Sequence, residues 1–341
     1  MKSLQFFNNK DLKSYLSLRK GEKRVGQYVF IIEDGLDELE HFKNRGAKFC
    51  LLGVPECIGP LGNGGKPGAQ FGWSAFLKAF LNVQSNRFLS GKELVLLGQV
   101  MVDDLMEQVL SLEKNSKYYL QKLHVLCESL DERVEEAVSA IAKAGLIPIV
   151  IGGGHNNAYP IISALANQLN NLNILNIDAH ADFRALEGRH SGNGFSYAFQ
   201  KGNIHKYAVY GLHQNYNSEN MLISMDAEKN ISYAFLEDIQ YTDKLFHHQI
   251  EFLKGDESKG LEIDMDSVRN MPSSAISPSG FSLEQMRYFL KKATKALSPA
   301  YLHLAEAAPI SEMDQLMVGK ALSYLVTDFV KSHEKRAYSN G

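Results

Sequence analysis

The sequence contains little cysteine, and it has no long apolar run. Three cysteines in 341 residues (Cys50, Cys57 and Cys127) are too few for a disulfide framework, which favours a reducing compartment. No segment approaches the roughly 18 apolar residues that span a bilayer. The first residues offer neither an unbroken apolar segment nor a cleavage site of the signal-peptide kind. We therefore expect a cytoplasmic protein with no membrane partner.

An excess of positive charge is also missing. Lys and Arg total 36 and Asp and Glu total 39, which gives a formal net charge of −3. Without a basic surplus we expect no nucleic-acid partner, because binding to a phosphate backbone depends on Lys and Arg. The hydrophobic fraction of 45% and the charged fraction of 22% are typical of a globular chain with a full core.

Eight short apolar runs alternate with helical patterns along the chain. Most of them are continuously apolar rather than alternating, as in strands that are covered on both faces. Strand–helix alternation favours right-handed crossovers and parallel pairing. The runs cover residues 48–54, 93–98, 146–151, 173–178, 206–211, 231–235, 260–266 and 301–306.

This pattern predicts a single three-layer α/β/α domain with a mostly parallel sheet of about eight strands. We place an N-terminal extension at residues 1–46, the catalytic domain at 47–333 and a C-terminal tail at 334–341. Ser282 followed by Gln285 is the signature of a capping box, which predicts that a helix begins there.

Residues that can bind a metal or take part in catalysis follow directly after three of the predicted strands. Asp178, His180 and Asp182 alternate directly after one strand, so an extended chain points all three side chains the same way. Alone, this pattern is also compatible with a solvent-exposed turn that has no chemical role. Asp264 and Asp266 share a face at the end of a second strand, and His155 follows three glycines after a third.

Parallel strands bring these ends to one edge of the sheet. The glycine run lacks the G-x-G-x-x-G or G-K-[ST] pattern of a phosphate loop, which favours His155 as a ligand. Four carboxylates and two imidazoles would require cations when buried together, and two divalent ions neutralise four negative charges. Oxygen-dominated ligands with some imidazole favour Mn²⁺ over Zn²⁺.

These motifs resemble the ureohydrolases, the family of arginase, agmatinase and formimidoylglutamase. The resemblance runs from about residue 47 to about residue 329, and it includes Asn63–Ala69 (NGGKPGA) and Glu306–Pro309 (EAAP). It implies an arginase-like fold, two Mn²⁺ ions and a homo-oligomer. It also implies metal ligation at six positions, which are His155, Asp178, His180, Asp182, Asp264 and Asp266.

By the same resemblance Asp178 and Asp264 bridge the two metals. Asp182 would also orient the attacking water as a catalytic residue, and Glu306 would bind the cationic amidine or guanidine of the substrate. Ser191 and Asn193 fall in a segment that would contact the substrate.

Differences from the family pattern reduce the number of possible substrates. Gly154 stands where arginase and agmatinase carry Asp, and Ser191 stands where arginase carries its proton-shuttling His. Both features resemble formimidoylglutamase. His190, one residue earlier, remains a candidate for proton transfer. Glu262 replaces the Ser that begins the family's S-x-D-x-D motif, which adds a carboxylate near the site.

The leading hypothesis is hydrolysis of N-formimidoyl-L-glutamate to L-glutamate and formamide. Such a substrate carries two carboxylates, so its pocket should offer arginine. Arg184 is the main candidate for this contact and Arg189 a lesser one. One alternative is hydrolysis of a guanidino compound with release of urea. A second is a metal-stabilised binding protein without turnover, and a single-zinc deacetylase is more distant.

Overall fold

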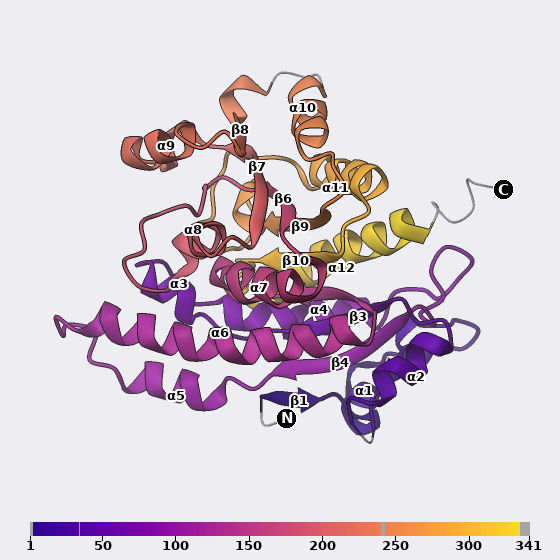
Figure 1. Cartoon of the computed structure of the whole chain (residues 1–341). Coiled ribbons are helices and arrows are strands. Elements are labelled where there is room, and N and C mark those ends of the chain that lie inside the picture. Colours follow the sequence, from indigo (N-terminus) through magenta and orange to yellow (C-terminus); the bar gives the residue numbers. More distant parts are fainter. Residues whose placement is uncertain (1–2, 34, 240–242, 335–341) are drawn as a thin grey trace.

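The computed structural model describes residues 3–33, 35–239 and 243–334, and Figure 1 shows the course of the chain. Ten strands of the described residues form one sheet, in the order β1-β4-β3-β5-β10-β9-β6-β7-β8, with β2 paired to β4. Only β1 runs antiparallel to its neighbour. The strands are β1 (Leu4–Phe6), β2 (Phe30–Ile31), β3 (Phe49–Gly53), β4 (Leu94–Val100), β5 (Ile147–Ile151), β6 (Leu172–Ile177), β7 (Ile204–Leu212), β8 (Ile231–Phe235), β9 (Ser258–Asp264) and β10 (Tyr301–Ala305).

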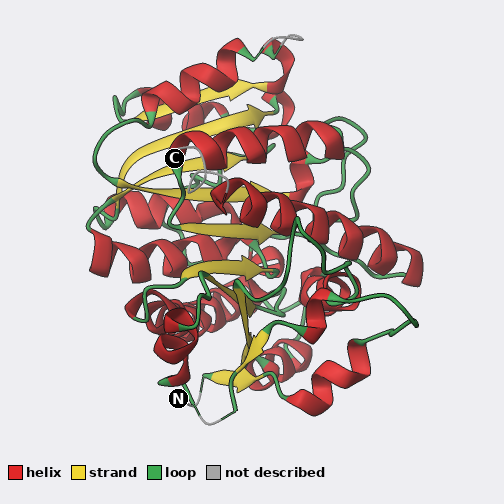
Figure 2. Ribbon diagram, turned by 90° about the vertical axis from the view of Figure 1, so that its right-hand side faces the viewer, coloured by secondary structure: helices red, strands yellow, loops and turns green. Residues whose placement is uncertain are grey.

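Helices cover both faces of this sheet, which confirms the three-layer α/β/α prediction (Figure 2). One face carries α1 (Asn9–Tyr15), α4 (Gly72–Phe80), α10 (Lys244–Phe252), α11 (Leu283–Leu297) and α12 (Glu312–Glu334). The other face carries α2 (Glu38–Asn44), α3 (Ile58–Gly62), α5 (Asp103–Ser111), α6 (Tyr119–Lys143), α7 (Ala158–Leu169), α8 (Gly194–Gln200) and α9 (Glu219–Asp226).

All eight predicted runs form strands, and the mostly parallel pairing is confirmed. The two additional strands, β1 and β2, belong to the predicted extension at 1–46, and both pair with β4. They have three and two residues, too few for a periodic pattern. The extension is therefore part of the sheet, and most of the predicted tail at 334–341 lies outside the described residues.

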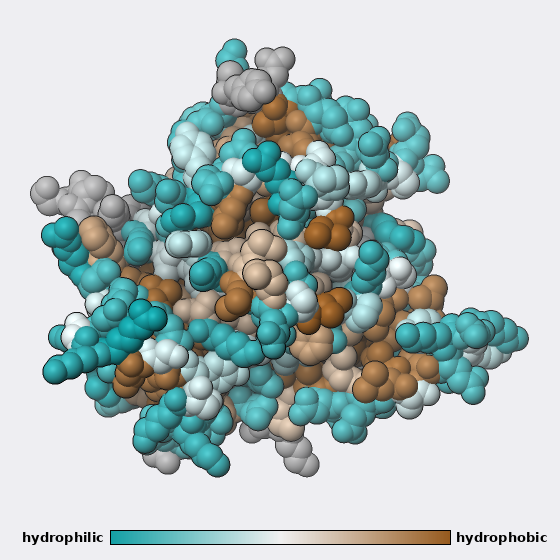
Figure 3. Space-filling view, turned by 180° about the vertical axis from the view of Figure 1, so that it is seen from behind, coloured by the Kyte–Doolittle hydropathy of each residue, from teal (hydrophilic) through white to brown (hydrophobic). Residues whose placement is uncertain are grey.

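The capping box ahead of α11 is present as predicted. The Ser282 hydroxyl accepts the backbone N–H of Gln285, and the Gln285 side chain accepts the N–H of Ser282. Seen from behind, the molecular surface has small apolar patches between polar ones (Figure 3). Within the described residues, no helix combines the length and the apolar character that a membrane span needs.

Four central strands, β5, β10, β9 and β6, bring the chemical motifs together. They are neighbours in that order, and all are parallel. Their registers place Ile151 beside Leu304, Ala305 beside Asp264 and Ile263 beside Ile177. The residues that follow each strand therefore meet at the carboxyl edge of the sheet, where α/β proteins bind ligands.

Candidate metal centre and active site

A cavity of about 190 Å³ lies at this edge. The segments after β9 and β10 and the loop between β6 and α8 supply most of its lining. The residues that line it include Asn63, His180, Asp182, Arg184, Ser191, Tyr216, Asp264, Asp266, Ser274 and Glu306.

His155 and three aspartates form the deeper group of possible metal ligands. His155 Nδ1 lies 3.1 Å from Asp178 Oδ2, 2.9 Å from Asp182 Oδ2 and 3.2 Å from Asp264 Oδ2. These four ligand atoms all lie within 4.8 Å of one another, and all four residues are buried. This geometry allows the four side chains to surround one cation.

The second group lies nearer the cavity. His180 Nδ1 is 3.7 Å from Asp178 Oδ1 and 3.8 Å from Asp266 Oδ2. Asp178 therefore faces the first group with one oxygen and the second group with the other, as a bridging ligand would. Asp264 faces His155 with Oδ2, whereas its Oδ1 accepts the backbone N–H of Asp266 at 2.6 Å. The bridging roles of Asp178 and Asp264 stay predictions.

The pKa values of the carboxyl groups reflect their crowding. Burial, and then the charges of Asp266 and Asp178, raise the pKa of Asp264 well above its usual value. Burial and the charge of Asp266 likewise raise the pKa of Glu306 to about 8. The protein groups alone thus oppose full ionisation of the cluster. An oxygen-rich donor set with two imidazoles fits divalent cations, which would relieve this repulsion.

Two cavity residues have a strained backbone. Asp182 has a φ of +46° and Glu306 a φ of +65°, both in the left-handed region. Each such residue costs about 1–3 kcal/mol, and this kind of strain gathers at functional sites. Glu306 Oε1 accepts the backbone N–H of His155 at 2.7 Å. Its Oε2 has no hydrogen-bond partner among the described residues, so one carboxylate oxygen is free for a ligand.

Of the predicted substrate contacts, Arg184 and Ser191 line the cavity. The Arg184 guanidinium is half exposed, and it already pairs with Glu187 at 2.7 Å and donates to Asn63 Oδ1 at 3.2 Å. A substrate carboxylate would therefore share this guanidinium with Glu187. Arg189 turns away from the cavity, because its buried side chain pairs with Asp131 at 2.8 Å.

His190 and Asn193 lie beside the cavity but do not line it. His190 Nδ1 accepts the backbone N–H of Gly192 at 3.1 Å, and its Nε2 lies 3.2 Å from Glu187 Oε1. Asn193 accepts from Arg189 at 2.8 Å and donates to the backbone of Gly188 at 2.7 Å. Both side chains thus stabilise the loop, and their predicted roles in proton transfer and substrate binding stay predictions.

Two further residues at the site carry no recognisable sequence signal. Buried Glu56 accepts the backbone N–H of Gly154 and the side-chain amide of Asn157, both at 2.7 Å, and so fixes the glycine turn before His155. Tyr216 stacks on His180 with 5.4 Å between ring centroids. Both contacts join segments far apart in the chain, so spacing alone could not reveal them.

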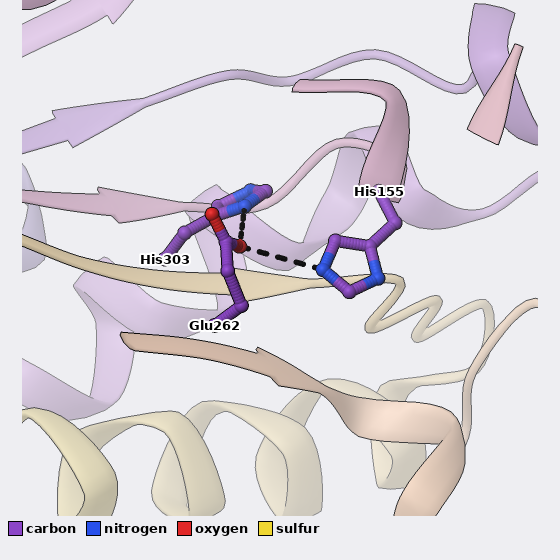
Figure 4. Close-up of side chains that lie close together, drawn as sticks. All are labelled: His155, Glu262 and His303. Carbon is purple, nitrogen blue, oxygen red and sulfur yellow. Dashed lines mark hydrogen bonds and ion pairs between the residues drawn. The ribbon is translucent and has the colours of Figure 1, made fainter. Parts of the chain in front are cut away.

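Glu262 lies between His303 and His155, the histidine of the deeper group (Figure 4). Its Oε2 is 2.7 Å from His303 Nδ1 and 3.4 Å from His155 Nε2, and its Oε1 accepts the Tyr301 hydroxyl at 2.6 Å. Burial opposes ionisation, but the charge and hydrogen bond of His303 and the nearby His155 outweigh it and lower the pKa of Glu262 to about 2. The additional carboxylate therefore contacts His155, a predicted metal ligand, through the ring nitrogen that faces away from the three aspartates.

A three-layer α/β/α fold with aspartates and histidines gathered at the carboxyl edge of its sheet defines an arginase-like protein. The chain belongs to the Arginase family, whose sequence model matches residues 47–329. The resemblance drawn from the three motifs is thereby confirmed.

Relatives and solved structures agree with this assignment. A formimidoylglutamase of Streptococcus pyogenes serotype M12 is 27% identical over 215 residues, which cover 58% of this chain and 65% of that relative. The structure of Trypanosoma cruzi formiminoglutamase with Mn²⁺ superimposes with a TM-score of 0.70 at 18% identity, over 91% of this chain and 98% of that one. Bacillus subtilis formimidoylglutamase gives a TM-score of 0.72 at 15% identity, over 96% and 99%.

Proposed function

We propose that this protein is a dinuclear metal hydrolase of linear amidines, with N-formimidoyl-L-glutamate as its substrate. Water would cleave the C–N bond to release L-glutamate and formamide. The observation that carries the proposal is one small cavity that joins two groups of His and Asp side chains to the free carboxylate oxygen of Glu306. Relatives named formimidoylglutamase support the choice of substrate.

We propose two Mn²⁺ ions as cofactors. His155, Asp178, Asp182 and Asp264 would hold one ion, and His180 and Asp266 would hold the other together with Asp178 and Asp264. Bound divalent metals supply Lewis acidity and lower the pKa of a coordinated water toward neutrality. The Mn²⁺ in the related T. cruzi structure supports this choice of metal.

The chain's own residues would bind and orient the reactants. Glu306 Oε2 would accept a hydrogen bond from the amidinium, a charge-assisted contact inside a buried site. Asp182 would orient the attacking water. Arg184 and Ser191, which line the same cavity, would contact the carboxylates of the substrate tail. Holding the amidine carbon close to the water lowers the entropic part of the barrier.

A second candidate is hydrolysis of a guanidino compound with release of urea. It is favoured by the Arg184–Glu187 ion pair, because an arginine that is already paired binds a carboxylate tail less strongly. A metal-stabilised binding protein without turnover is less consistent with the site, since all six ligand positions hold His or Asp.

The experiment compares substrates directly. Purified protein is loaded with Mn²⁺ and incubated separately with formiminoglutamate, arginine, agmatine and guanidinobutyrate, and formamide and urea are measured. We expect formamide from formiminoglutamate and little urea from the others. Efficient urea release from agmatine without formamide production would contradict the proposal, and inactivity toward all four would favour the binding protein.

We also propose a homo-oligomer in the cytoplasm. Exposed apolar side chains on and before α12 support self-association: Ile310 is 66% exposed, Met313 70% and Leu316 61%.

A further inference from the structure

The segment behind His155 is built differently from the family pattern. Glu262 occupies the position where the family's S-x-D-x-D motif begins with Ser. Its carboxylate is fully buried, and so are its neighbours Tyr301 and His303. A buried ionised carboxylate is costly unless hydrogen bonds and positive charge compensate it. The structure must therefore give this carboxylate specific partners.

Adjacent strands supply these partners. Glu262 on β9 and His303 on β10 are paired directly in the sheet register. Tyr301 precedes His303 by two residues, so it points to the same face of the sheet. The Tyr301 hydroxyl donates to Oε1 at 2.6 Å, and His303 Nδ1 lies 2.7 Å from Oε2. These two contacts fix the Glu262 carboxylate from both sides.

The two nitrogens of His155 face different surroundings. Nδ1 lies within 3.2 Å of three aspartate oxygens, at the position of the deeper metal group. Nε2 points the opposite way, toward Glu262 Oε2 at 3.4 Å (Figure 4). When Nδ1 of a neutral imidazole ligates a metal, Nε2 carries the hydrogen, and a carboxylate is a good acceptor for it.

We propose that Glu262, held by Tyr301 and His303, is a positioning residue for the metal ligand His155. It selects the tautomer with a free lone pair on Nδ1, orients the ring before metal arrives and increases the basicity of Nδ1. The inference rests on the proposed dinuclear metal site. Among the described residues, Glu262 contacts His155 but not His180, the other proposed ligand histidine. Glu262 and its two partners would therefore affect the affinity of one of the two metal sites.

The same three residues, His155, Glu262 and His303, also have the composition of a metal site of their own. That arrangement requires Nε2 of His155 as a ligand. A neutral imidazole has only one lone pair for a metal, and a cation held by the three aspartates around Nδ1 would use it. The positioning role therefore accounts for the geometry better than a third metal.

The test measures metal binding rather than turnover. Metal-free wild-type protein and Glu262→Gln are titrated with Mn²⁺, and free Mn²⁺ is followed by electron paramagnetic resonance. Glutamine keeps the size and can still accept a hydrogen bond, but it lacks the negative charge. We expect one of the two sites to weaken by about 10- to 100-fold and the other to keep its affinity.

Two variants serve as comparisons. Tyr301→Phe keeps the carboxylate but removes one of its hydrogen bonds, so we expect a smaller loss at the same site. Glu93→Gln is the matched control, because Glu93 is also buried and also accepts from a hydroxyl, that of Ser90 at 2.6 Å. It precedes β4 at the opposite edge of the sheet, and its change should leave both affinities unaltered.

The outcomes separate this inference from the proposed function. If wild-type protein binds fewer than two Mn²⁺ ions, the proposed dinuclear site fails. If wild-type protein binds two and Glu262→Gln binds both equally well, the positioning role is overturned. An equal loss at both sites, together with a lower Tm of the metal-free variant, would also overturn it by revealing a structural role. Three tightly bound ions in the wild type would overturn it in favour of a separate metal site.

Discussion

At the scale of single residues, the cavity combines carboxylates that differ in their hydrogen bonds. Asp264 has both oxygens in contact with neighbouring groups, whereas Glu306 is bound through Oε1 alone. Asp266 accepts the backbone N–H of Ala275 at 3.0 Å. A free oxygen on a strained, buried residue is best explained by a ligand that completes its hydrogen bonds.

Replacing Glu306 by Gln should separate substrate binding from metal binding. The contact of an ionised carboxylate with a cationic amidine contributes about 1.5–3 kcal/mol, so we expect kcat/KM to fall by up to about 10²-fold. Manganese content, measured by elemental analysis, should remain at the wild-type value because Glu306 is not assigned as a ligand. Loss of metal in this variant would instead place Glu306 among the ligands.

Replacing Arg184 by Ala should distinguish the two substrate classes. Loss of its contact with a substrate carboxylate should cost about 1.5–3 kcal/mol, or roughly 10- to 150-fold in kcat/KM for formiminoglutamate, mostly through KM. Turnover of agmatine, which has no carboxylate, should change little. Steady-state kinetics with both compounds measure this, with Arg133→Ala as a control at a partly exposed ion pair. Unchanged kinetics for formiminoglutamate would exclude Arg184 from the binding of its tail.

His190 should make the metal-free protein less stable in mild acid. Burial, and then the charge of Arg184, lower the pKa of His190 from 6.5 to about 4. Between these values the unfolded chain takes up a proton that the folded chain does not, so the free energy of unfolding falls as the pH falls. The slope from this residue is up to about 1.4 kcal/mol per pH unit. Urea unfolding between pH 7 and pH 5 measures it.

Asparagine is the matched replacement for this measurement, since it can also cap the short helical turn at Ser191–Asn193. The His190→Asn variant should therefore show a shallower decrease in stability over the same pH interval. Equal slopes for the two proteins would mean that His190 is protonated alike in the folded and unfolded states.

At the scale of elements, strand ends were far more predictable than loops. Each of the eight runs is a strand because nearly continuous apolar sequence is stable only when covered on both faces. Neighbouring parallel strands then bring His155, Asp178 and Asp264 together without further information. The loop from Phe183 to Asn193 follows no such rule, and its two arginines point in different directions.

The two arginines differ because Arg189 makes a long-range contact that no periodic sequence pattern predicts. Arg189 donates to Asp131 on α6 and lies over the rings of Tyr159 and Tyr197, at 4.6 and 4.8 Å from their centroids. This contact anchors the loop to the helical layer. Arg184 instead forms an exposed pair with Glu187 of the same loop, donates to Asn63 and lines the cavity. Closeness to Asp182 in the sequence therefore predicted correctly that Arg184 reaches the cavity, but it did not predict where Arg189 points.

Breaking the anchor should destabilise the fold strongly. Asp131→Ala leaves a buried guanidinium without its carboxylate, and such losses cost about 3–5 kcal/mol. Denaturant unfolding measures this value. Asp104→Ala is the matched control, because it breaks an Arg–Asp pair whose Asp side chain is 58% exposed, and it should cost less than about 1 kcal/mol. If both variants lose a similar free energy of unfolding, the buried pair stabilises the fold no more than the exposed one.

At the scale of the whole molecule, the proposed metal ligands come from three segments spread over residues 155–266, and neighbouring parallel strands bring them together. Metal bound between them should therefore stabilise the native state as a unit. A ligand at 100 times its Kd adds about 2.7 kcal/mol to the free energy of unfolding.

Chelation should lower the Tm accordingly. We expect Mn²⁺-loaded protein to lose several degrees in Tm when treated with EDTA, by about 1–2 °C for each kcal/mol in a chain of this length, and to regain them when Mn²⁺ is restored. Differential scanning fluorimetry over a range of Mn²⁺ concentrations measures the shift. A Tm that does not depend on Mn²⁺ would contradict tight binding to the native state.

The position of β10 has a consequence for synthesis on the ribosome. This strand is the last of the described chain, yet it lies between β5 and β9 in the middle of the sheet. Until residues 301–305 have emerged, the nascent chain cannot join its two halves, and the facing edges of β5 and β9 are unpaired. Open edges of this kind invite pairing with other chains. The nascent protein is thus most exposed to aggregation until this strand inserts, and the candidate active-site cavity is completed in that same late step.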